Sequence, residues 1–253
     1  MKRIDHKEIY SDGKSYDALN VFDTDVPFYS KLIAKYGQPI LELACGTGRI
    51  TVPIAKKGFE IVGIDISEAM INEAKEKAAE AKQDIEFIEA DIRDFELNQK
   101  FSVIFLPFNS ICHLHDFESI ASCFSCVKKH LKPDGRFVID VFKPDFKILL
   151  RDKNKRYECA DYKNPYADNH VKLTETNWYN EADQINQVKW YFEIGEKEIE
   201  QDLNMRMFYP QELDNYLRFA GFEIEEKFGD YNGSIFTSDS SKQIIISGMR
   251  NNK

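Results

Sequence analysis

A strand-like aliphatic run that leads directly into two closely spaced glycines is the feature that most constrains how this chain can fold. Residues 40–49 read Ile-Leu-Glu-Leu-Ala-Cys-Gly-Thr-Gly-Arg, so we expect a strand over residues 40–44, a turn at Gly46 and Gly48, and then a helix. Glycines at such a turn let a ligand approach the backbone. Because open parallel sheets bind ligands at the carboxyl ends of their strands, this pattern predicts an α/β protein with a ligand site at the turn.

Short aliphatic runs alternate with helical patterns between residues 39 and 142, which is typical of a parallel sheet covered by helices. Ser67 is placed to cap the helix that follows the second run. Residues 92–100 are short for a helical crossover between the third and fourth strands. The strands are expected at residues 40–44, 59–65, 85–90, 101–106 and 136–142.

The flanking segments differ in pattern from this core. Pro27 opens a predicted helix that Gly37 ends, and an arm that carries Tyr16 precedes it. After the core, a helix over residues 210–220 and two strands over residues 222–228 and 243–249 are expected to close the fold. We therefore predict an N-terminal helical arm or cap (1–38), a core (39–144 and 209–253) and an inserted lid or substrate subdomain (145–208).

The predicted insertion holds both tryptophans and several alternating stretches, which indicate a small antiparallel sheet. Leu203, Met205 and Met207 alternate with polar residues that include Arg206. Alternation of this kind gives a strand one face toward the core and one toward solvent or ligand. We expect Arg206 on the second of these faces.

Two acidic residues follow the next two predicted strands. Asp65 ends the second strand, 19 positions after Gly46, and Asp91 follows the third. A carboxylate in the first of these places can accept both hydroxyls of a ribose, and Asp91 is placed to take an adenine amino group. Thr51 stands where a dinucleotide-binding motif has its third glycine, so we expect a nucleoside without a pyrophosphate.

Residues 42–48, Asp65 and residues 90–92 resemble the first three motifs of class I S-adenosylmethionine-dependent methyltransferases. The resemblance covers residues 39–142 and implies S-adenosylmethionine as cofactor. It also implies a Rossmann-like three-layer sandwich, in which a seven-stranded, mostly parallel sheet ends in a reversed hairpin. Ala44 stands in the predicted site where many members have a glycine. By this resemblance Glu42, Gly46 and Gly48 surround the methionine part, Asp65 binds the ribose, Ile66 packs on the adenine, and Asp91 with Ile92 reads the adenine edge.

Other segments resemble small-molecule methyltransferases, including bacterial enzymes that methylate amino sugars and carry a small sheet inserted after the fifth strand. The matching segments are residues 16–19, 107–110, 113–114, 205–213 and 220–222. The function predicted from this resemblance is in-line transfer of a methyl group to a nitrogen or oxygen atom of a small-molecule acceptor.

The chemistry of methyl transfer suggests further site residues. Aromatic faces attract a sulfonium cation, so Tyr16, Tyr29 and Phe108 are predicted to contact the cofactor. His113 follows the fourth strand and is predicted to act as the base, because an unperturbed imidazole titrates at about 6.5. Tyr16 is the second predicted catalytic residue. The residues predicted to bind the acceptor are Asn109, His113, Arg206 and Tyr209.

Composition limits the partners and the compartment. The chain has 34 Lys and Arg against 43 Asp and Glu, so its net charge of -9 makes nucleic acid a poor partner. No run approaches the roughly 20 apolar residues of a membrane span, and an odd number of cysteines, 5, suits the reducing cytoplasm. Cys123 and Cys126 share a helical stripe, so we expect a structural role for them and no metal site.

Other interpretations stay open at this point. A nicotinamide-dependent oxidoreductase would suit the same strand, turn and Asp65. A non-catalytic module that binds S-adenosylmethionine and engages a protein partner is a different class of answer. The sequence does not identify the acceptor, the atom that is methylated, or whether the chain is a monomer or a homodimer.

Overall fold

The computed structural model describes residues 9–250, which form two compact units. Unit 1 contains residues 9–21 and Pro144–Met207, and unit 2 contains Phe22–Lys143 and residues 208–250. Each unit has a sheet of its own.

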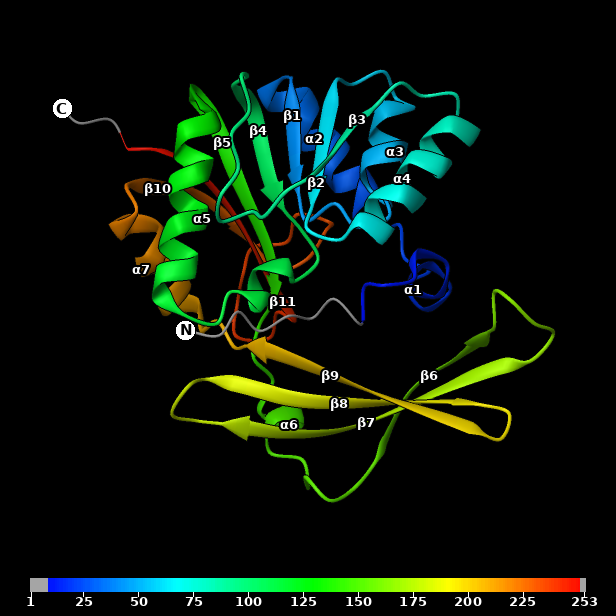
Figure 1. The fold of residues 1–253 in the computed structure, drawn as a ribbon. Coiled ribbons are helices and arrows are strands. Elements are labelled where there is room, and N and C mark those ends of the chain that lie inside the picture. Colours follow the sequence, from blue (N-terminus) through cyan, green and yellow to red (C-terminus); the bar gives the residue numbers. More distant parts are fainter. Residues whose placement is uncertain (1–8, 251–253) are drawn as a thin grey trace. The chain divides into compact units, whose positions relative to one another are not determined.

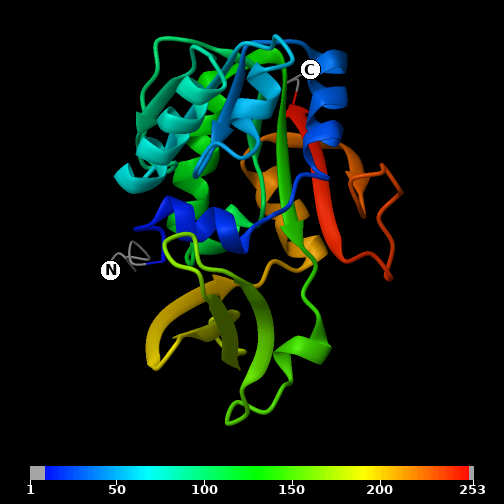
Figure 2. The same cartoon turned by 90° about the vertical axis from the view of Figure 1, so that its right-hand side faces the viewer.

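The sheet of unit 2 has seven strands in the order β10-β11-β5-β4-β1-β2-β3 (Figure 1). The five strands from β1 to β5 are parallel, whereas β11 runs antiparallel to both β5 and β10 (Figure 2 shows β11 beside β5). This arrangement confirms the mostly parallel sheet with a reversed final hairpin. The strands are β1 Ile40–Leu43, β2 Ile61–Asp65, β3 Glu86–Glu89, β4 Phe101–Leu106, β5 Leu131–Phe142, β10 Phe222–Phe228 and β11 Lys242–Met249.

The strand order reverses between β1 and β4. The chain proceeds from β1 to β2 and β3 in one direction across the sheet, and then restarts at β4 on the other side of β1. In open α/β sheets this reversal is where ligands bind, at the carboxyl ends of the strands. The fold therefore directs attention to the segments that follow β1, β2, β3 and β4.

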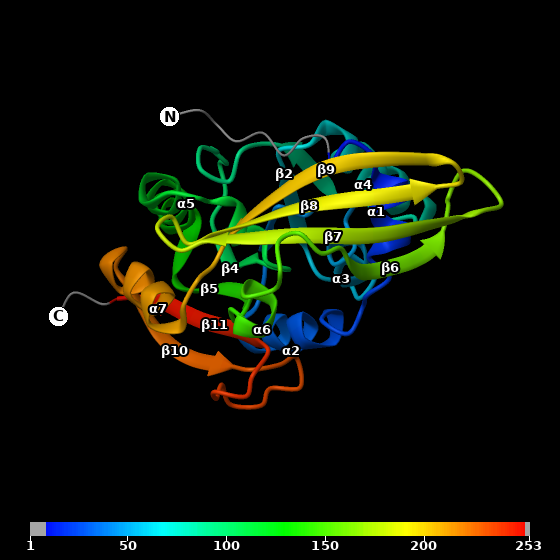
Figure 3. The ribbon, with the colours of Figure 1, turned by 90° about the horizontal axis from the view of Figure 1, so that it is seen from below.

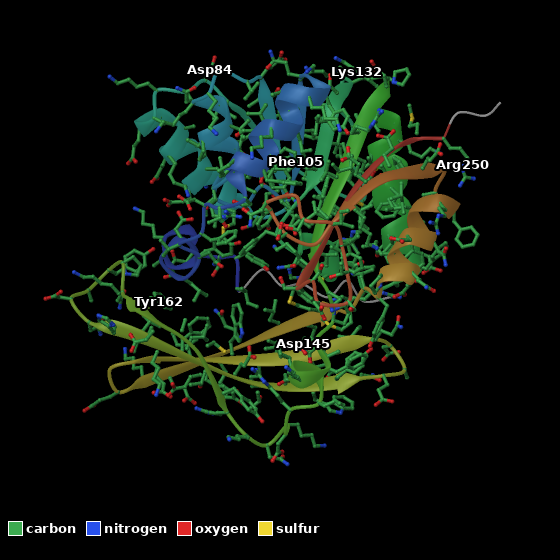
Figure 4. The ribbon with its side chains drawn as sticks, turned by 180° about the vertical axis from the view of Figure 1, so that it is seen from behind. Asp84, Phe105, Lys132, Asp145, Tyr162 and Arg250 are labelled. Atoms are coloured by element: carbon green, nitrogen blue, oxygen red, sulfur yellow. The ribbon has the colours of Figure 1, made fainter. Side chains whose placement is uncertain are left out.

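Helices cover both faces of this sheet. Figure 1 shows α5 in front of the sheet and α2 behind it, and Figure 4 shows the same layers from the opposite side. Side chains of α2 and α3 share one buried cluster with β1, β4 and β5, while Phe124 of α5 packs against Phe137 and Phe222 on the other face. None of the helices within residues 9–250 is long and apolar enough to span a bilayer. The helices are α2 Val26–Tyr36, α3 Thr51–Ala55, α4 Glu68–Glu80, α5 Phe117–His130, α7 Pro210–Phe219 and the 3-10 helix η1 Ser110–His113.

The connection from β3 to β4 contains turns and one isolated bridge, and no helix, across residues 90–100. A buried histidine of α5 anchors it instead. His130 Nε2 accepts a hydrogen bond from Leu97 N at 2.9 Å, its Nδ1 donates to Cys126 O at 2.7 Å, and its ring stacks on Phe95. Both Cys123 and Cys126 lie in α5, as expected.

Unit 1 contains the inserted antiparallel sheet that the sequence predicts. Its four strands lie in the order β6-β7-β8-β9, each antiparallel to the next, and Figure 3 shows β7, β8 and β9 side by side. The elements of this unit are α1 Gly13–Leu19, α6 Phe146–Leu149, β6 Tyr157–Lys163, β7 His170–Asn180, β8 Ile185–Ile194 and β9 Lys197–Arg206.

The end of β9 departs from the predicted alternation. Leu203 is buried as expected, but Arg206 is buried as well, and Met205 is half-buried. The guanidinium of Arg206 lies against the side-chain oxygen of Gln184 at 3.4 Å, and Gln184 precedes β8, which pairs with β9. Arg206 therefore does not lie on a solvent-exposed face of this strand, because its side chain is buried beside Gln184, and its expected contact with a ligand stays a prediction.

Candidate functional site

The turn after β1 has the backbone of a close-approach loop. Ala44, Gly46 and Gly48 all have positive φ angles, of 53, 55 and 72°. A Cβ on Gly48 would meet Val52 and Ala74 at 3.2 and 3.3 Å, so glycine is needed there for close helix packing. No described atom lies within 4 Å of the place where a Cβ of Gly46 would sit. The two glycines thus have different uses, since Gly48 allows packing and Gly46 leaves open space beside the backbone.

Asp65, the last residue of β2, is tied to this turn. Its Oδ2 accepts the backbone N–H of Gly46 and its Oδ1 that of Ser67, both at 2.8 Å. The side chain is 8% exposed, and desolvation raises its pKa, while the backbone hydrogen bonds act in the opposite direction. A carboxylate offers about four acceptor positions, so Asp65 keeps acceptor capacity for a ligand hydroxyl beside its backbone hydrogen bonds.

Glu42 lies beneath the turn and is 2% exposed. Its carboxylate accepts the hydroxyl of Thr51, the first residue of α3. Burial raises the pKa of Glu42 to about 8, against the opposing effects of this hydrogen bond and of Arg49. Thr51, which the sequence singled out only as a missing glycine, orients this acid.

Asp91 follows β3 and forms a fork-like ion pair with Arg93. Arg93 Nη2 lies 2.6 Å from Oδ2, and Arg93 N and Nε lie 2.9 Å from Oδ1. A ligand amino group that binds this carboxylate has to compete with the guanidinium. Ile92 is half-buried beside it, and Ile66 after β2 is 46% exposed, which is unusual for an aliphatic side chain at a strand end.

The loop after β4 has an uncommon backbone. Phe108 and Asn109 have φ angles of 52 and 64°, in the left-handed region that is costly for residues other than glycine. The buried Asp140 of β5 holds this backbone, because its Oδ2 accepts Phe108 N and its carbonyl accepts Asn109 N at 3.3 and 3.0 Å. Asn109 Oδ1 accepts a hydrogen bond from Phe142 N at 2.7 Å, which ties this loop to the end of β5.

The remaining predicted residues lie in different surroundings. His113 ends η1 and is half-buried, and Tyr209 immediately precedes α7, where the carboxylate of Glu212 accepts its backbone N–H. Tyr16 lies on α1 with its ring 5.9 Å from that of Tyr10, and together with Arg206 it belongs to unit 1.

Tyr29 requires a correction. It is 0% exposed, and its ring stacks on Phe105 of β4 with centroids 4.6 Å apart; Figure 4 labels Phe105 beneath α2. Burial and the nearby carboxylate of Asp140 raise the pKa of its phenol. The structure assigns Tyr29 to the core and not to a surface that a cofactor could contact, because α2 turns its inner face to the sheet.

Sequence reasoning missed several buried polar residues. Arg49 forms an ion pair with Asp25, and Asp140 receives hydrogen bonds from Tyr231 and Lys242. Asp140 could have been found, since it interrupts an aliphatic run in a strand that is buried on both faces. Asp25 could not, because it is 24 positions from Arg49 and nothing local marks the pair.

The arrangement fits the adenosyl and methionine parts of S-adenosylmethionine. The ends of neighbouring strands supply room beside Gly46, a hydroxyl acceptor in the carboxylate of Asp65, and an apolar surface in the exposed Ile66. A pyrophosphate has no comparable place, because Thr51 is fully buried and its hydroxyl donates a hydrogen bond to Glu42.

Comparisons with known proteins agree with this arrangement. Residues 40–135 match the family model described as a methyltransferase domain. The protein YqeM of Bacillus subtilis (strain 168) is 27% identical over 218 residues, which cover 81% of this chain and 85% of that protein.

Two solved structures share the fold over almost the whole chain. The methyltransferase CcbJ from Streptomyces caelestis superposes with a TM-score of 0.82 at 22% identity, covering 96% of this chain and 98% of that one. An S-adenosylmethionine-dependent methyltransferase from Clostridium acetobutylicum ATCC 824 gives 0.77 at 20% identity, covering 94% and 97%. The family match and the motifs that carry it lie in the same strands and turns. Residues 40–135 form a methyltransferase domain, and the chain that carries it is an S-adenosylmethionine-dependent methyltransferase.

Proposed function

We propose that this enzyme methylates a nitrogen or oxygen atom of a small-molecule acceptor by in-line displacement. The observation that carries the proposal is the junction of Gly46 and Asp65, where an ordered carboxylate lies beside open backbone at the switch point of the sheet. S-adenosylmethionine supplies an electrophilic methyl group on a positively charged sulfur. The chain supplies binding, orientation and exclusion of water, and orientation alone can contribute roughly 7–11 kcal/mol.

The proposed cofactor contacts follow the strand ends. Asp65 accepts the ribose hydroxyls, Ile66 packs on the adenine, and Asp91 with Ile92 reads the adenine edge. The methionine part is surrounded by Glu42, Ala44, Gly46 and Gly48, and the ring of Phe108 attracts the sulfonium. Arg49 already covers one face of that ring, with its Cζ 4.7 Å from the centroid.

An amine is the favoured acceptor group. One relative is a Streptomyces venezuelae dTDP-3-amino-3,4,6-trideoxy-alpha-D-glucopyranose N,N-dimethyltransferase, and another is a Streptomyces cypemycin N-terminal methyltransferase. Both names describe methylation of nitrogen. We infer an amino group carried by a sugar or a similarly small polar molecule as the acceptor of this enzyme.

Such an amine must lose a proton to act as a nucleophile. We propose His113, at the end of η1 after β4, as the base, with Asn109 and Tyr209 as acceptor-binding residues. We further propose Tyr16 as a catalytic and cofactor-binding residue, Arg206 as an acceptor-binding residue, and unit 1 as a lid. The five free thiols suit a cytoplasmic enzyme.

Turnover with defined acceptors tests the function. The purified chain is incubated with S-adenosylmethionine and, separately, a nucleotide-linked amino sugar, the corresponding hydroxyl sugar, a peptide with a free N-terminus and phosphoethanolamine. Mass spectrometry then measures S-adenosylhomocysteine and the methylated product. Methylation of the amino sugar and none of the hydroxyl sugar is expected. Reduction of a nicotinamide cofactor, read at 340 nm, with no methylated product in any mixture would overturn the proposal.

Variants separate the proposed roles. Asp65→Ala is expected to weaken S-adenosylhomocysteine binding by about 100-fold or more, because hydrogen bonds to a charged group contribute about 1.5–3 kcal/mol each.

His113→Ala is expected to bind S-adenosylhomocysteine like the wild type but to lose turnover with the amine and the acidic limb of its pH-rate profile. Equal rates and profiles for His113→Ala and the wild type would exclude His113 as the base.

A further inference from the structure

One side chain joins three segments that border the carboxyl ends of β1 and β4. Arg49 directly follows Gly48 in the glycine turn. Its Nη1 and Nη2 lie 2.8 and 2.7 Å from the two carboxylate oxygens of Asp25, and Nη1 also donates to Phe22 O at 2.6 Å. Asp25 is 0% exposed and the Arg49 side chain 14%. Two parallel bonds of this kind fix the orientation of a guanidinium as well as its position.

Aromatic rings pack on the same guanidinium. Its Cζ lies 4.7 Å from the ring centroid of Phe108 and 5.5 Å from that of Phe22, and the two rings are 6.0 Å apart. The Arg49 clamp, defined as Arg49, Asp25, Phe22 and Phe108, therefore connects the glycine turn with the segment before α2 and with the loop after β4.

The loop that this clamp holds is strained. Phe108 and Asn109 have φ angles of 52 and 64°. Such conformations persist only where the surroundings determine them, and they concentrate at functional sites. From β5, Asp140 holds the backbone of this loop and Phe142 N holds the side chain of Asn109, while Arg49 packs on the ring of Phe108.

We propose that Arg49 is a positioning residue for cofactor binding, which acts by holding the glycine turn, the Phe22–Asp25 segment and the Phe108 ring in one preformed arrangement. This inference rests on the proposed placement of the cofactor at the glycine turn. A site that is ordered before binding spends less of its interaction energy on ordering, so loosening the clamp lowers affinity. Lysine cannot replace Arg49, because an ammonium forms neither the fork nor the planar stack.

Calorimetric titration with S-adenosylhomocysteine tests the proposal, because it reports both Kd and the fraction of chains that bind. Arg49→Lys and Asp25→Asn are each expected to raise Kd by about 10-fold at full stoichiometry. The double variant is expected to be no weaker than the worse single one, because the two residues act as one unit. Arg156→Lys is the matched control. Arg156 forms the same fork with Glu198 and lies over the Tyr191 ring, but in unit 1 and exposed, so its Kd should equal that of the wild type.

The outcomes are distinguishable. A wild type that does not bind S-adenosylhomocysteine contradicts the proposed site itself. A wild type that binds, together with an unchanged Kd for Arg49→Lys, overturns the role of Arg49. Reduced stoichiometry at unchanged Kd also overturns it, because that result shows partial unfolding only.

Phe22→Leu removes one ring and leaves the ion pair, so this variant tests the proposal if the charge variants do not fold. Its Kd should lie between those of the wild type and Arg49→Lys, and an unchanged Kd counts against the clamp.

Discussion

Ala44 carries the backbone conformation of a glycine. Its φ of 53° lies in the left-handed region, at the position where the resemblance to other methyltransferases led us to expect a glycine. An L-residue in that region costs roughly 1–2 kcal/mol, whereas glycine there loses more entropy on folding. The turn is therefore stabilised by its surroundings against the preference of its own residue.

Ala44→Gly is expected to stabilise the fold by about 0.5–1 kcal/mol, the difference between those two effects. Urea unfolding measures the change. Ala78→Gly in the last turn of α4 is the matched control, and it should destabilise by about 1 kcal/mol or more, because helices disfavour glycine and a buried methyl group is lost. Destabilisation by both substitutions would show that the left-handed backbone at Ala44 is not strained.

Glu42 should make stability depend on pH. Its pKa of about 8 in the folded state is above the ordinary value of 4.5, so between these values the folded chain holds a proton that the unfolded chain has released. The contribution of Glu42 is thus complete below about pH 4.5 and is lost as the pH rises through 8. Relative to Glu42→Gln, the wild type is expected to lose about 1 kcal/mol per pH unit between pH 5 and 8.

Urea unfolding of both proteins at pH 5, 6, 7 and 8 gives this difference directly. Glu76→Gln, the same substitution on the exposed side of α4, is the control and should follow the wild type throughout. Parallel curves for the wild type and Glu42→Gln would contradict the raised pKa.

At the scale of elements, α5 anchors the connection from β3 to β4. The connection from β3 to β4 has no helix of its own within residues 90–100, and His130 fastens it to the end of α5 through Leu97 and the Phe95 ring. Because Nε2 accepts a hydrogen bond from Leu97 N and Nδ1 faces the carbonyl oxygen of Cys126, this geometry places the ring N–H on Nδ1.

His130→Ala is expected to destabilise unit 2 by roughly 3 kcal/mol, because it leaves a cavity and a buried backbone N–H without its acceptor. Thermal unfolding measures the loss, and nitrogen chemical shifts of the wild type should report the Nδ1-protonated tautomer. His170→Ala, at an exposed histidine of unit 1, should change stability by less than about 0.5 kcal/mol. A comparable loss in both variants would remove this role from His130.

Much of this architecture is legible in the sequence for physical reasons. β4 begins and ends where its aliphatic run predicts, and β10 does so where Gly221 and its alternating pattern predict. β5 begins at Leu131, five positions before the prediction, because Leu131 pairs with Phe101 of β4; the register is then interrupted across Pro133 and Gly135 and resumes at Arg136. Local pattern reveals the glycine turn, Asp65 and Asp91. It does not reveal that Arg49 pairs with Asp25, since that contact exists only once α2 has packed on the sheet.

At the scale of the whole molecule, each unit has its own sheet and buried residues. A ligand that binds only the folded form stabilises what it binds, by about 2.7 kcal/mol at 100 times its Kd. We expect S-adenosylhomocysteine at that concentration to raise the unfolding temperature of unit 2 by about 5–10 °C.

Scanning calorimetry resolves this effect when combined with tryptophan fluorescence, since both tryptophans, Trp178 and Trp190, report from unit 1. The unfolding of unit 2 should appear in calorimetry without a change in tryptophan fluorescence. The ligand should shift this transition to a higher temperature. An equal shift of the fluorescence transition would show that the two units unfold together.

Three thiols are buried while unit 2 is folded. Cys45, Cys112 and Cys123 are buried, and a Cβ on Gly63 would already collide with the Cys45 sulfur at 2.9 Å. Burial raises the pKa of each, so little thiolate is present to react. Alkylation at these three positions therefore requires that unit 2 open, and the alkylation rate measures how often unit 2 unfolds.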